Sequence, residues 1–461
     1  MISLSFHGAV GTVTGSKYLL TTNDYKVLID CGIFQGAKVL RQKNWESPAF
    51  NPKDINSVVL THAHIDHIGY LPRLLRDGFS KSVYATAPTV EMAKILLLDT
   101  AHINEEDASY RNRKKATSHK IALPLFTTED TKKVFNLFKA VNYCQWVKLN
   151  KEVKFRYHNV GHILGAGSVE FRINDNGKKT SILFSGDIGR YAMPLTIEPS
   201  APPETDYLIC ESTYGGVIHE PLDIFFEFAK LLDDIIKRKS ILLIPSFAVG
   251  RTQQMTYIIN VLIKQKRIPP IDVHIDSPMA VKVTDIYRRF PSFHSINCDL
   301  LKNEKNVFYG KNVFLHRKRK SSKLLNKLKG PAIIISASGM LSGGRILHHL
   351  INRLPDKDTT VALVSYMAEG TLGRKLLEGS DMVYIHKIPI KVRARIVSFL
   401  GLSGHADSYE IFHWLAHWDK SPKKVFITHG EPSRSDALAK DINNIKGWNC
   451  HIPYPDETIE L

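Results

Sequence analysis

The stretch "THAHIDHIGYLP" at residues 61–72 places three histidines and an aspartate within six positions. It directly follows "INSVVL" at residues 55–60, whose apolar side chains are typical of a buried strand. After it, Leu71, Leu74 and Leu75 have the spacing of one apolar helix face. Because an open α/β sheet presents its ligands at the C-terminal ends of its strands, we predict that this loop carries a functional site.

Composition and charge restrict the class of protein. The chain has 461 residues, which is enough for two or three domain-sized cores. Its 62 Lys and Arg residues outnumber 45 Asp and Glu residues, and the net charge of +17 favours an anionic partner such as nucleic acid. No run of 18 apolar residues and no secretory leader pattern is present, so neither a membrane span nor secretion is expected. The five cysteines are scattered without Cys-x-x-Cys spacing, which favours a reducing cytoplasm over disulfides or a thiolate zinc site.

The pattern of apolar segments predicts an insertion. Residues 1–214 are strand-rich, with a charged and helix-like stretch over residues 90–140. Residues 215–389 contain four successive units of apolar strand, small-residue loop and helix, which predict a parallel sheet flanked by helices. Residues 390–461 form two further strands and a helix and are too few to fold alone. We therefore expect residues 390–461 to complete the first domain and residues 215–389 to be inserted into it.

Further residues of the metal-ligand type end other predicted strands. His162, Asp187 and His429 occupy such positions, although each of them alone would be interpreted as a buried histidine or a turn cap. Together with the first cluster they make seven candidate ligands: His62, His64, Asp66, His67, His162, Asp187 and His429. Imidazole and carboxylate groups suit zinc, and seven of them exceed the needs of one tetrahedral ion. Two zinc ions that share one carboxylate are the simplest arrangement, and such pairs act on phosphate esters. Asp30, which also ends a strand, is expected to hydrogen-bond a ligand rather than bind metal.

With the motifs "ESTYG" (211–215), "PSFAVGRTQ" (245–253), "SGHAD" (403–407) and "THGE" (428–431), the chain resembles the β-CASP family of metallo-β-lactamase-fold ribonucleases. The resemblance covers essentially the whole chain. It implies an α/β fold, an αββα sandwich with an inserted β-CASP domain. It also implies that His62, His64 and His162 hold one zinc ion, that Asp66, His67 and His429 hold the other, and that Asp187 bridges both.

The same resemblance implies a mechanism. Water activated between the two metals would attack the phosphorus, with Asp66 counted among the catalytic residues. His405, oriented by Glu211, would protonate the leaving 3′ oxygen and leave products with 5′-phosphate and 3′-hydroxyl ends. A histidine at position 429 points toward RNA, because DNA nucleases of the family carry an apolar residue there. The expected activity is endonucleolytic, 5′-exonucleolytic or both.

The inserted domain is expected to hold the RNA backbone. Its strand–loop–helix units point backbone N–H groups at their loops, and small residues allow phosphate to approach. The candidate substrate-binding residues are Ser246, Arg251, Ser336, Ser338, Gly339, Ser342, Gly343, Arg345, Ser403 and Tyr214. Of the basic runs at residues 111–115 and 316–323, we expect at least one to follow the RNA backbone, although most such runs are solvated surface.

The sequence therefore predicts a zinc-dependent ribonuclease of single-stranded RNA, with a homodimer or an RNA-processing protein as a possible partner. We expect no separate RNA-binding domain beside these two domains, so RNA affinity is expected to come from them or from a partner. Two alternatives remain. One is a binuclear zinc hydrolase of a small ester or thioester, which leaves the insertion and the charge unexplained. The other is a nuclease-dead RNA-binding or scaffold subunit, although every expected ligand is present.

Overall fold

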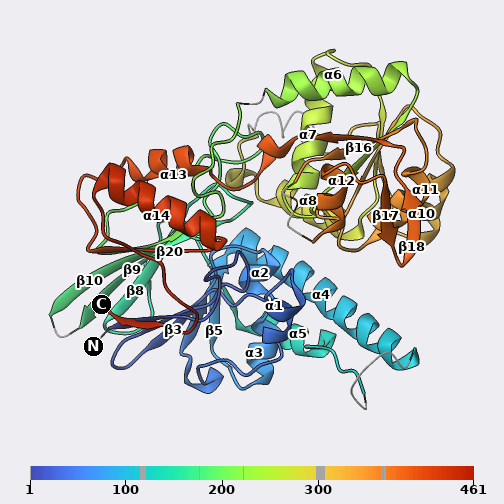
Figure 1. Cartoon of the computed structure of the whole chain (residues 1–461). Coiled ribbons are helices and arrows are strands. Elements are labelled where there is room, and N and C mark those ends of the chain that lie inside the picture. The colour runs from blue at the N-terminus through green and yellow to red at the C-terminus, as the bar shows by residue number, and fades with distance from the viewer. Residues whose placement is uncertain are drawn as a thin grey trace. The chain divides into compact units, whose positions relative to one another are not determined.

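The computed structural model describes residues 2–114, 121–175, 177–221, 223–296, 307–365, 367 and 370–461. The chain divides into two compact units (Figure 1). Unit 1 comprises Met1–Ala192, Ile197–Ile218 and Gly404–Leu461, and unit 2 comprises Met193–Thr196 and His219–Ser403. Unit 2 is thus inserted into unit 1, as the resemblance implied.

Unit 1 is built on two seven-stranded sheets. The first has the order β22-β1-β2-β3-β4-β5-β6, in which β3 to β6 are mutually parallel. Its strands are β1 (Ser3–Phe6), β2 (Tyr18–Thr21), β3 (Lys26–Ile29), β4 (Ser57–Val59), β5 (Ser82–Thr86), β6 (Phe138–Val141) and β22 (Thr458–Glu460). The second sheet has the order β21-β20-β11-β10-β9-β8-β7. Its strands are β7 (Val147–Lys148), β8 (Val153–Asn159), β9 (Gly167–Asp175), β10 (Lys178–Phe184), β11 (Tyr207–Glu211), β20 (Lys424–Thr428) and β21 (Cys450–His451).

One apolar core lies between these two sheets. Alternate residues of β8 and β9 are buried in it while their neighbours point to the opposite face, as the period of a strand requires. Phe155, Phe171 and Phe184 of the second sheet share this core with Phe6 and Leu20 of the first. Burying each such side chain contributes roughly 1.5–3 kcal/mol to folding. The core therefore fixes the two sheets against each other and aligns the strand ends that carry the site.

The helices of unit 1 were predicted less accurately. They are α1 (Lys38–Lys43), α2 (Ile65–Ile68), α3 (Leu71–Arg76), α4 (Ala87–Arg113), α5 (Thr128–Val134), α13 (Ser408–Leu415) and α14 (Pro432–Lys446). The expectation of helix throughout residues 90–140 is wrong in its last part, because α5 ends at Val134 and β6 begins at Phe138. A new helix starts at α5 because Thr127 and Asp130 form a capping box.

Unit 2 contains a six-stranded, entirely parallel sheet of order β14-β13-β15-β12-β16-β19. Its strands are β12 (Ile241–Pro245), β13 (Asp272–Ile275), β14 (Val313–Leu315), β15 (Ala332–Ser336), β16 (Thr359–Leu363) and β19 (Arg395–Ser398). Its helices are α6 (Ile224–Lys237), α7 (Arg251–Lys264), α8 (Pro278–Arg289), α10 (Arg319–Leu324), α11 (Arg345–Arg353) and α12 (Leu372–Leu377), and β17 (Met382–Ile385) pairs with β18 (Ile388–Lys391) as a separate hairpin. Separate apolar cores lie on the two faces of the sheet. The predicted α/β architecture is confirmed.

The structure places one boundary differently from the predicted division at residues 389/390. β19 pairs in parallel with β16 and so belongs to unit 2, and unit 1 resumes only at Gly404. The sequence of β19 resembles any other short apolar strand, and its sheet is determined by pairing that no local pattern shows. Among the described residues, none of the helices combines the length and apolarity needed to cross a bilayer.

Candidate metal centre

Seven candidate ligands of unit 1 meet at one end of its two sheets. His62 and His64 lie in the loop after β4, and Asp66 and His67 lie in the short helix α2 that follows. His162, Asp187 and His429 follow β8, β10 and β20, respectively. These are C-terminal strand ends, so the sequence-based placement corresponds to the observed one. The side chains fall into two groups that share one carboxylate.

The first group contains three imidazoles and Asp187. Nδ1 of His64 lies 3.0 Å from Nε2 of His62 and 3.1 Å from Nε2 of His162. Oδ2 of Asp187 lies 3.3 Å from Nε2 of His62 and 3.5 Å from Nε2 of His162. Ligand atoms at the corners of a tetrahedron around zinc are separated by about 3.3 Å, given bonds of about 2.0 Å. The first group therefore has the spacing of a tetrahedral metal site.

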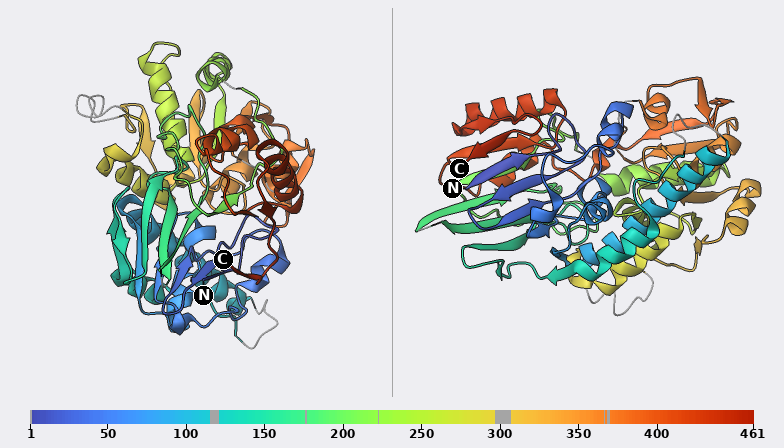
Figure 2. Two further views of the ribbon diagram at one scale, coloured as in Figure 1. Left: turned by 90° about the vertical axis from the view of Figure 1, so that its left-hand side faces the viewer. Right: turned by 90° about the horizontal axis from the view of Figure 1, so that it is seen from below.

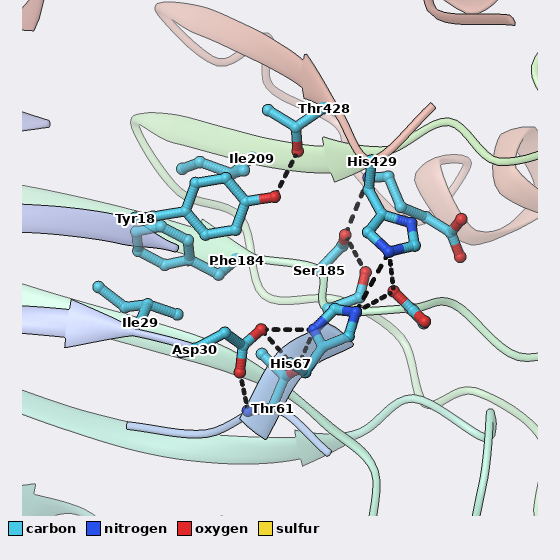
Figure 3. Close-up of a pocket in the computed structure, with 13 residues that line it drawn as sticks. Tyr18, Ile29, Asp30, Thr61, His67, Phe184, Ser185, Ile209, Thr428 and His429 are labelled. Carbon is cyan, nitrogen blue, oxygen red and sulfur yellow. Dashed lines mark hydrogen bonds and ion pairs between the residues drawn. The ribbon is translucent and has the colours of Figure 1, made fainter. Parts of the chain in front are cut away.

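The second group contains Asp66, His67 and His429. Nε2 of His67 and Nε2 of His429 are 3.2 Å apart. Oδ2 of Asp66 lies 3.6 Å from Nε2 of His429 and 3.9 Å from Nε2 of His67. Oδ1 of Asp187 lies 3.3 Å from Nε2 of His67 and 3.6 Å from Nε2 of His429. Figure 3 shows two of these side chains, His67 and His429, with Asp30 and Thr61 beside His67.

Asp187 thus offers one oxygen to each group. It is almost fully buried, and its Oδ1 has no hydrogen-bond donor among the described residues. A buried carboxylate oxygen without a partner is costly, because it loses its hydration without replacement. A cation in the second group would supply the missing partner. The donor set, its spacing and this buried oxygen that accepts no hydrogen bond all fit a pair of metal ions.

Hydrogen bonds on the second ring nitrogens fix the orientation of the imidazoles. Nδ1 of His67 donates to Oδ2 of Asp30 at 2.8 Å, so its Nε2 faces the centre. Asp30 also accepts hydrogen bonds from the backbone N–H of Thr61 at 2.7 Å and from its hydroxyl at 2.9 Å. The hydroxyl of Thr61 lies 3.0 Å from Nδ1 of His62 and can accept its proton. Asp30 therefore orients the candidate ligand His67. Metal-binding histidines usually donate their second N–H to a carboxylate in this way.

Two further partners were not predicted from the sequence. Nδ1 of His162 lies 3.0 Å from the backbone carbonyl of Gly404, and Nδ1 of His429 lies 3.1 Å from the hydroxyl of Thr213. Thr61 and Thr213 stand next to or near predicted site residues, which is a weak signal because threonine is common in loops. The Gly404 carbonyl has no side-chain signal at all, and only the fold brings it to His162.

His405 and Glu211 form a pair beside the first group. Nδ1 of His405 lies 3.2 Å from each carboxylate oxygen of Glu211, and Nε2 of His405 lies 3.9 Å from Oδ2 of Asp187. Glu211 is itself held by the backbone N–H of Ile188 at 2.6 Å and by the hydroxyl of Thr213 at 2.5 Å. Geometry alone also allows Asp187, Glu211 and His405 to be a third ligand group. The Glu211 contact turns Nε2 of His405 toward the metal centre.

The electrostatics separate the histidines into two kinds. Burial lowers the pKa of His62 to about 3 and that of His64 to about 4. Both rings are thus neutral at physiological pH, which is the form that binds metal. For His405, burial disfavours the charged form, but Glu211 and Asp187 outweigh it and raise the pKa to about 9. His405 therefore carries a proton at neutral pH in this environment.

The carboxylates of the centre are ionised. Although burial opposes ionisation, His429 and His67 hold the pKa of Asp66 below its usual range. Burial likewise opposes ionisation of Asp187, and its histidine neighbours hold its pKa well below the ordinary value. For His67, Asp187 and Asp30 outweigh burial and raise the pKa well above the usual value. This field of buried negative charge favours a cation at the centre.

The predicted substrate-binding residues of unit 2 lie at the C-terminal ends of its parallel strands. Ser246 follows β12 and Ser336 ends β15, where the N–H of Ser246 donates to the carbonyl of Ser336 at 3.0 Å. The hydroxyls of Ser338 and Ser342 form a hydrogen bond of 3.1 Å. A Cβ atom on Gly339 would lie 2.9 Å from the ring of Phe247, whereas Gly343 faces open space. These loops are brought together within unit 2, and their contact with RNA stays a prediction.

The two predicted phosphate-binding arginines have partners within unit 2. Arg251, at the start of α7, is buried and donates to the Gln254 side chain and the Leu402 carbonyl. Arg345, at the start of α11, donates to Oδ1 of Asp276 at 2.7 Å and to the His316 carbonyl at 2.7 Å. These contacts hold the loops in shape, which the sequence did not indicate.

The remaining predicted residues are distributed over both units. Tyr214 is partly buried, with its ring 6.3 Å from that of His405, and Ser403 is buried at the end of unit 2. In the run 111–115, Arg111 pairs with Asp107 at 2.9 Å, and Lys115 lies outside the described residues. In the run 316–323, residues 317–320 are exposed. A role of either run in RNA binding stays a prediction.

Comparison with known proteins identifies the family. Residues 19–188 match the metallo-β-lactamase superfamily domain, residues 252–376 the β-CASP domain, and residues 389–453 the Zn-dependent metallo-hydrolase RNA specificity domain. The chain is 33% identical to ribonuclease TTHA0252 of Thermus thermophilus over 436 residues, which is 94% of each chain. It is 30% identical to the transcription termination factor FttA of Methanococcus maripaludis over 486 residues, which covers 100% of this chain and 72% of that protein.

The fold is also found in a solved structure. A protein of unknown function from Enterococcus faecalis V583 matches this chain over the full length of both, with a TM-score of 0.57 and 15% sequence identity. This likeness concerns the fold alone. The family matches, the relative from Thermus thermophilus and the shared-carboxylate metal centre agree with one another. The chain belongs to the β-CASP family of metallo-β-lactamase-fold ribonucleases.

Proposed function

We propose that this protein is a two-zinc ribonuclease that hydrolyses phosphodiester bonds of single-stranded RNA. The observation that carries the proposal is the pair of ligand groups that share Asp187. His62, His64 and His162 would hold one ion, and Asp66, His67 and His429 would hold the other. When bound, two such ions supply Lewis acidity, which lowers the pKa of water and offsets charge on a phosphodiester.

The chain's own residues then provide orientation and proton transfer. Glu211 holds Nδ1 of His405 at 3.2 Å, and the raised pKa of about 9 keeps a proton available at Nε2. We propose that this proton passes to the 3′ oxygen as it leaves, which gives 3′-hydroxyl and 5′-phosphate products. Asp30 and Thr61 keep the ligand rings in place and hold their Nε2 atoms toward the centre.

RNA as the substrate is supported by the comparisons and by the charge. The relative from Thermus thermophilus is named a ribonuclease, and residues 389–453 match an RNA specificity domain. The net charge of +17 favours a polyanion. The complete ligand set argues against a nuclease-dead scaffold, and a small-ester hydrolase would not need the β-CASP domain. A cytoplasmic location and a homodimer or protein partner stay predictions.

End-labelled single-stranded RNA tests the proposal directly. The metal-loaded protein should cleave it, a chelator should abolish cleavage, and Asp187→Ala should be inactive with reduced metal content. A ladder of products would indicate endonuclease activity, and release from one end would indicate exonuclease activity. Absence of RNA cleavage by protein that holds two zinc ions would contradict the proposed function.

A further inference from the structure

The outer face of the second sheet of unit 1 carries a cluster of cations around one tryptophan. Nζ of Lys154 lies 4.6 Å from the centroid of a Trp146 ring, and the guanidinium carbons of Arg156 and Arg172 lie 4.5 and 5.3 Å from it. All three distances are within the range of a cation–π interaction. Together with Lys148 these residues are called the Trp146 surface below.

The strand register places like charges directly opposite one another on this surface. Lys148 of β7 pairs with Lys154 of β8, and Lys154 pairs with Arg172 of β9. All three side chains are exposed. Directly opposed like charges destabilise a sheet, so this row has a cost to folding that a bound anion would remove. Over three strands the row extends about 10 Å, given a spacing of about 4.8 Å between strands.

One buried carboxylate orders the arginines of the surface. Oε2 of Glu170 accepts a hydrogen bond from Nε of Arg156 at 2.6 Å, and its Oε1 accepts one from Nε of Arg172 at 2.8 Å. His158 adds a contact to Oε2 at 2.9 Å. Binding through Nε leaves the terminal amino groups of both arginines for another acceptor. Of the four permanent cations of the surface, Arg156 and Arg172 are thus held in a defined orientation by Glu170.

The surface lies away from the helices that cover this sheet. α14 contacts β20 and β21, at the opposite edge from β7 and β8. Figure 2 shows α13 and α14 over that other part of the sheet. β8 itself connects the surface to the metal centre, because it runs from Lys154 to Asn159 and is followed by His162. At about 3.3 Å per residue, Lys154 and His162 are separated by at most about 26 Å.

We propose that the Trp146 surface binds the backbone of single-stranded RNA at a distance from the cleavage site. The exposed cations would neutralise backbone phosphates. Proteins bind single strands through such cations together with aromatic rings or guanidinium planes that contact the bases. The inference rests on the proposed function, because it takes RNA as the anion. An RNA that reaches both places binds more tightly than one that reaches only the metal centre.

The test compares two pairs of substitutions with the same change of charge. Lys148→Gln with Lys154→Gln alters the surface without removing a partner of Glu170. Lys81→Gln with Lys440→Gln, at two exposed lysines of unit 1, is the control. Affinity is measured by fluorescence anisotropy with a 2′-O-methyl single strand of about 30 nucleotides, whose integrity is checked on gels. Circular dichroism confirms that each variant is folded.

We expect the surface pair to bind the long strand about tenfold more weakly at low salt. The slope of log affinity against log salt should decrease by about 1.4, at about 0.7 for each lost phosphate contact. The control pair should stay within about twofold of wild type. Cleavage of an RNA of about four nucleotides should have an unchanged kcat/KM, because so short a strand does not span the distance.

A second variant separates the effect of the charges from that of the indole ring. Trp146→Leu keeps every cation but removes the ring that holds them, so affinity should decrease while the salt slope is retained. Equal affinities and slopes for the surface pair and wild type would overturn the proposal. Polyglutamate serves as a probe for an acidic protein partner. If the surface pair weakened binding of polyglutamate but not of RNA, the proposal would also be overturned, and the surface would be assigned to an acidic protein. If wild type neither binds nor cleaves RNA, the proposed function fails as well.

Discussion

At the scale of single residues, four of the candidate metal-binding rings, those of His62, His67, His162 and His429, have a hydrogen-bond partner on the nitrogen that faces away from the centre. Asp30 serves His67, Thr61 serves His62, and the Gly404 carbonyl serves His162. The seven candidate ligands could be predicted from the sequence because zinc accepts few residue types and these stand at strand ends. Most of the acceptors could not be predicted, because threonines and backbone carbonyls occur everywhere and only the fold selects the ones that matter.

Asp187 should matter most for metal content. It offers one oxygen to each ligand group, at 3.3 Å from His62 and 3.3 Å from His67. We expect Asp187→Ala to lose most of both metal ions, whereas His64→Ala should mainly reduce the first, because His64 belongs to only one group. Elemental analysis after repletion and gel filtration measures this. Equal loss in the two variants would argue against a shared ligand.

His405 should matter for catalysis rather than for metal binding. If it donates a proton, His405→Ala should keep near-normal zinc content and RNA affinity while kcat decreases roughly 10²–10⁴-fold. Glu211→Gln should give a related loss, and the double variant should be no worse than His405→Ala alone. The measurement is single-turnover cleavage, together with zinc content.

A modified substrate separates the two roles of His405. An RNA with sulfur in place of the leaving 3′ oxygen needs no protonation, so wild type and His405→Ala should cleave it almost equally. The same deficit as with ordinary RNA would show that His405 is not the proton donor. Loss of zinc from His405→Ala would instead place it among the ligands, as the third geometric group allows.

At the scale of elements, the site depends on how closely the segment after β3 approaches helix α2. Cys31 N–H donates to the His67 carbonyl at 2.7 Å, and Gly32 N–H donates to the Ser16 carbonyl at 3.0 Å. A Cβ atom on Gly32 would lie 1.5 Å from the carbonyl oxygen of Asp66. No side chain fits between these backbones, so a glycine is required for packing rather than for its dihedral angles.

Gly32→Ala should therefore displace α2, which carries Asp66 and His67. We expect a loss of stability of about 1–3 kcal/mol, the usual cost of overpacking, together with reduced zinc content. Gly343→Ala is a suitable control for these two measurements, because a Cβ atom there meets nothing within 4 Å. Thermal unfolding and elemental analysis give the result. A Gly32→Ala protein with normal zinc content and stability would contradict this account of the packing.

The carboxyl group of Glu170, on the outer face of the second sheet, should make the stability of the fold depend on pH. Burial disfavours ionisation of Glu170, but hydrogen bonds from His158, Arg156 and Arg172 outweigh it and lower the pKa to about 2. A carboxyl whose pKa is lowered by folding stabilises the folded state above its unfolded value of about 4.3. This contribution decreases as the pH falls from there through about 2.

Glu170→Gln should remove that contribution. At pH 7 we expect stability to decrease by about 1–3 kcal/mol, and the difference from wild type should shrink between about pH 5 and pH 2. Urea unfolding at several pH values provides the measurement. Glu152→Gln, on a partly buried glutamate before β8, is a control that should show a smaller change. A difference that stays constant over this pH range would rule out ionisation of Glu170 as the cause.

The limits of sequence-based prediction are clearest at the level of elements. The four strand–loop–helix units of unit 2 were recognisable because parallel strands buried on both faces are continuously apolar. β19 was assigned to the first domain, although it pairs with β16 of unit 2, since strand pairing is not a local property. β6 was hidden at the end of the helix-like stretch over residues 90–140. Arg251 and Arg345 have partners within their own unit, and no charge pattern distinguishes such an arginine from one that awaits phosphate.

At the scale of the whole molecule, the excess of positive charge and the inserted domain point to a polymeric substrate. A small ester would fill only the metal centre of unit 1, whereas a polyanion can use cations distributed over the chain. With a net charge of +17, long-range attraction should accelerate association and should be screened by salt. The charge could be predicted from composition, whereas the position of the cations required the structure.

The preference for single-stranded RNA is testable with the full chain. We expect cleavage of single-stranded RNA to exceed that of duplex RNA or of DNA of the same sequence. Each phosphate contact releases counterions, so KM for a long RNA should rise steeply between about 50 and 200 mM salt. By contrast, kcat should change little, because the groups of the metal centre are buried and weakly screened. Steady-state kinetics on matched substrates at several salt concentrations measure both. Comparable cleavage of DNA would remove RNA as the specific substrate, whereas a KM independent of salt would show that the positive charge does not take part in binding.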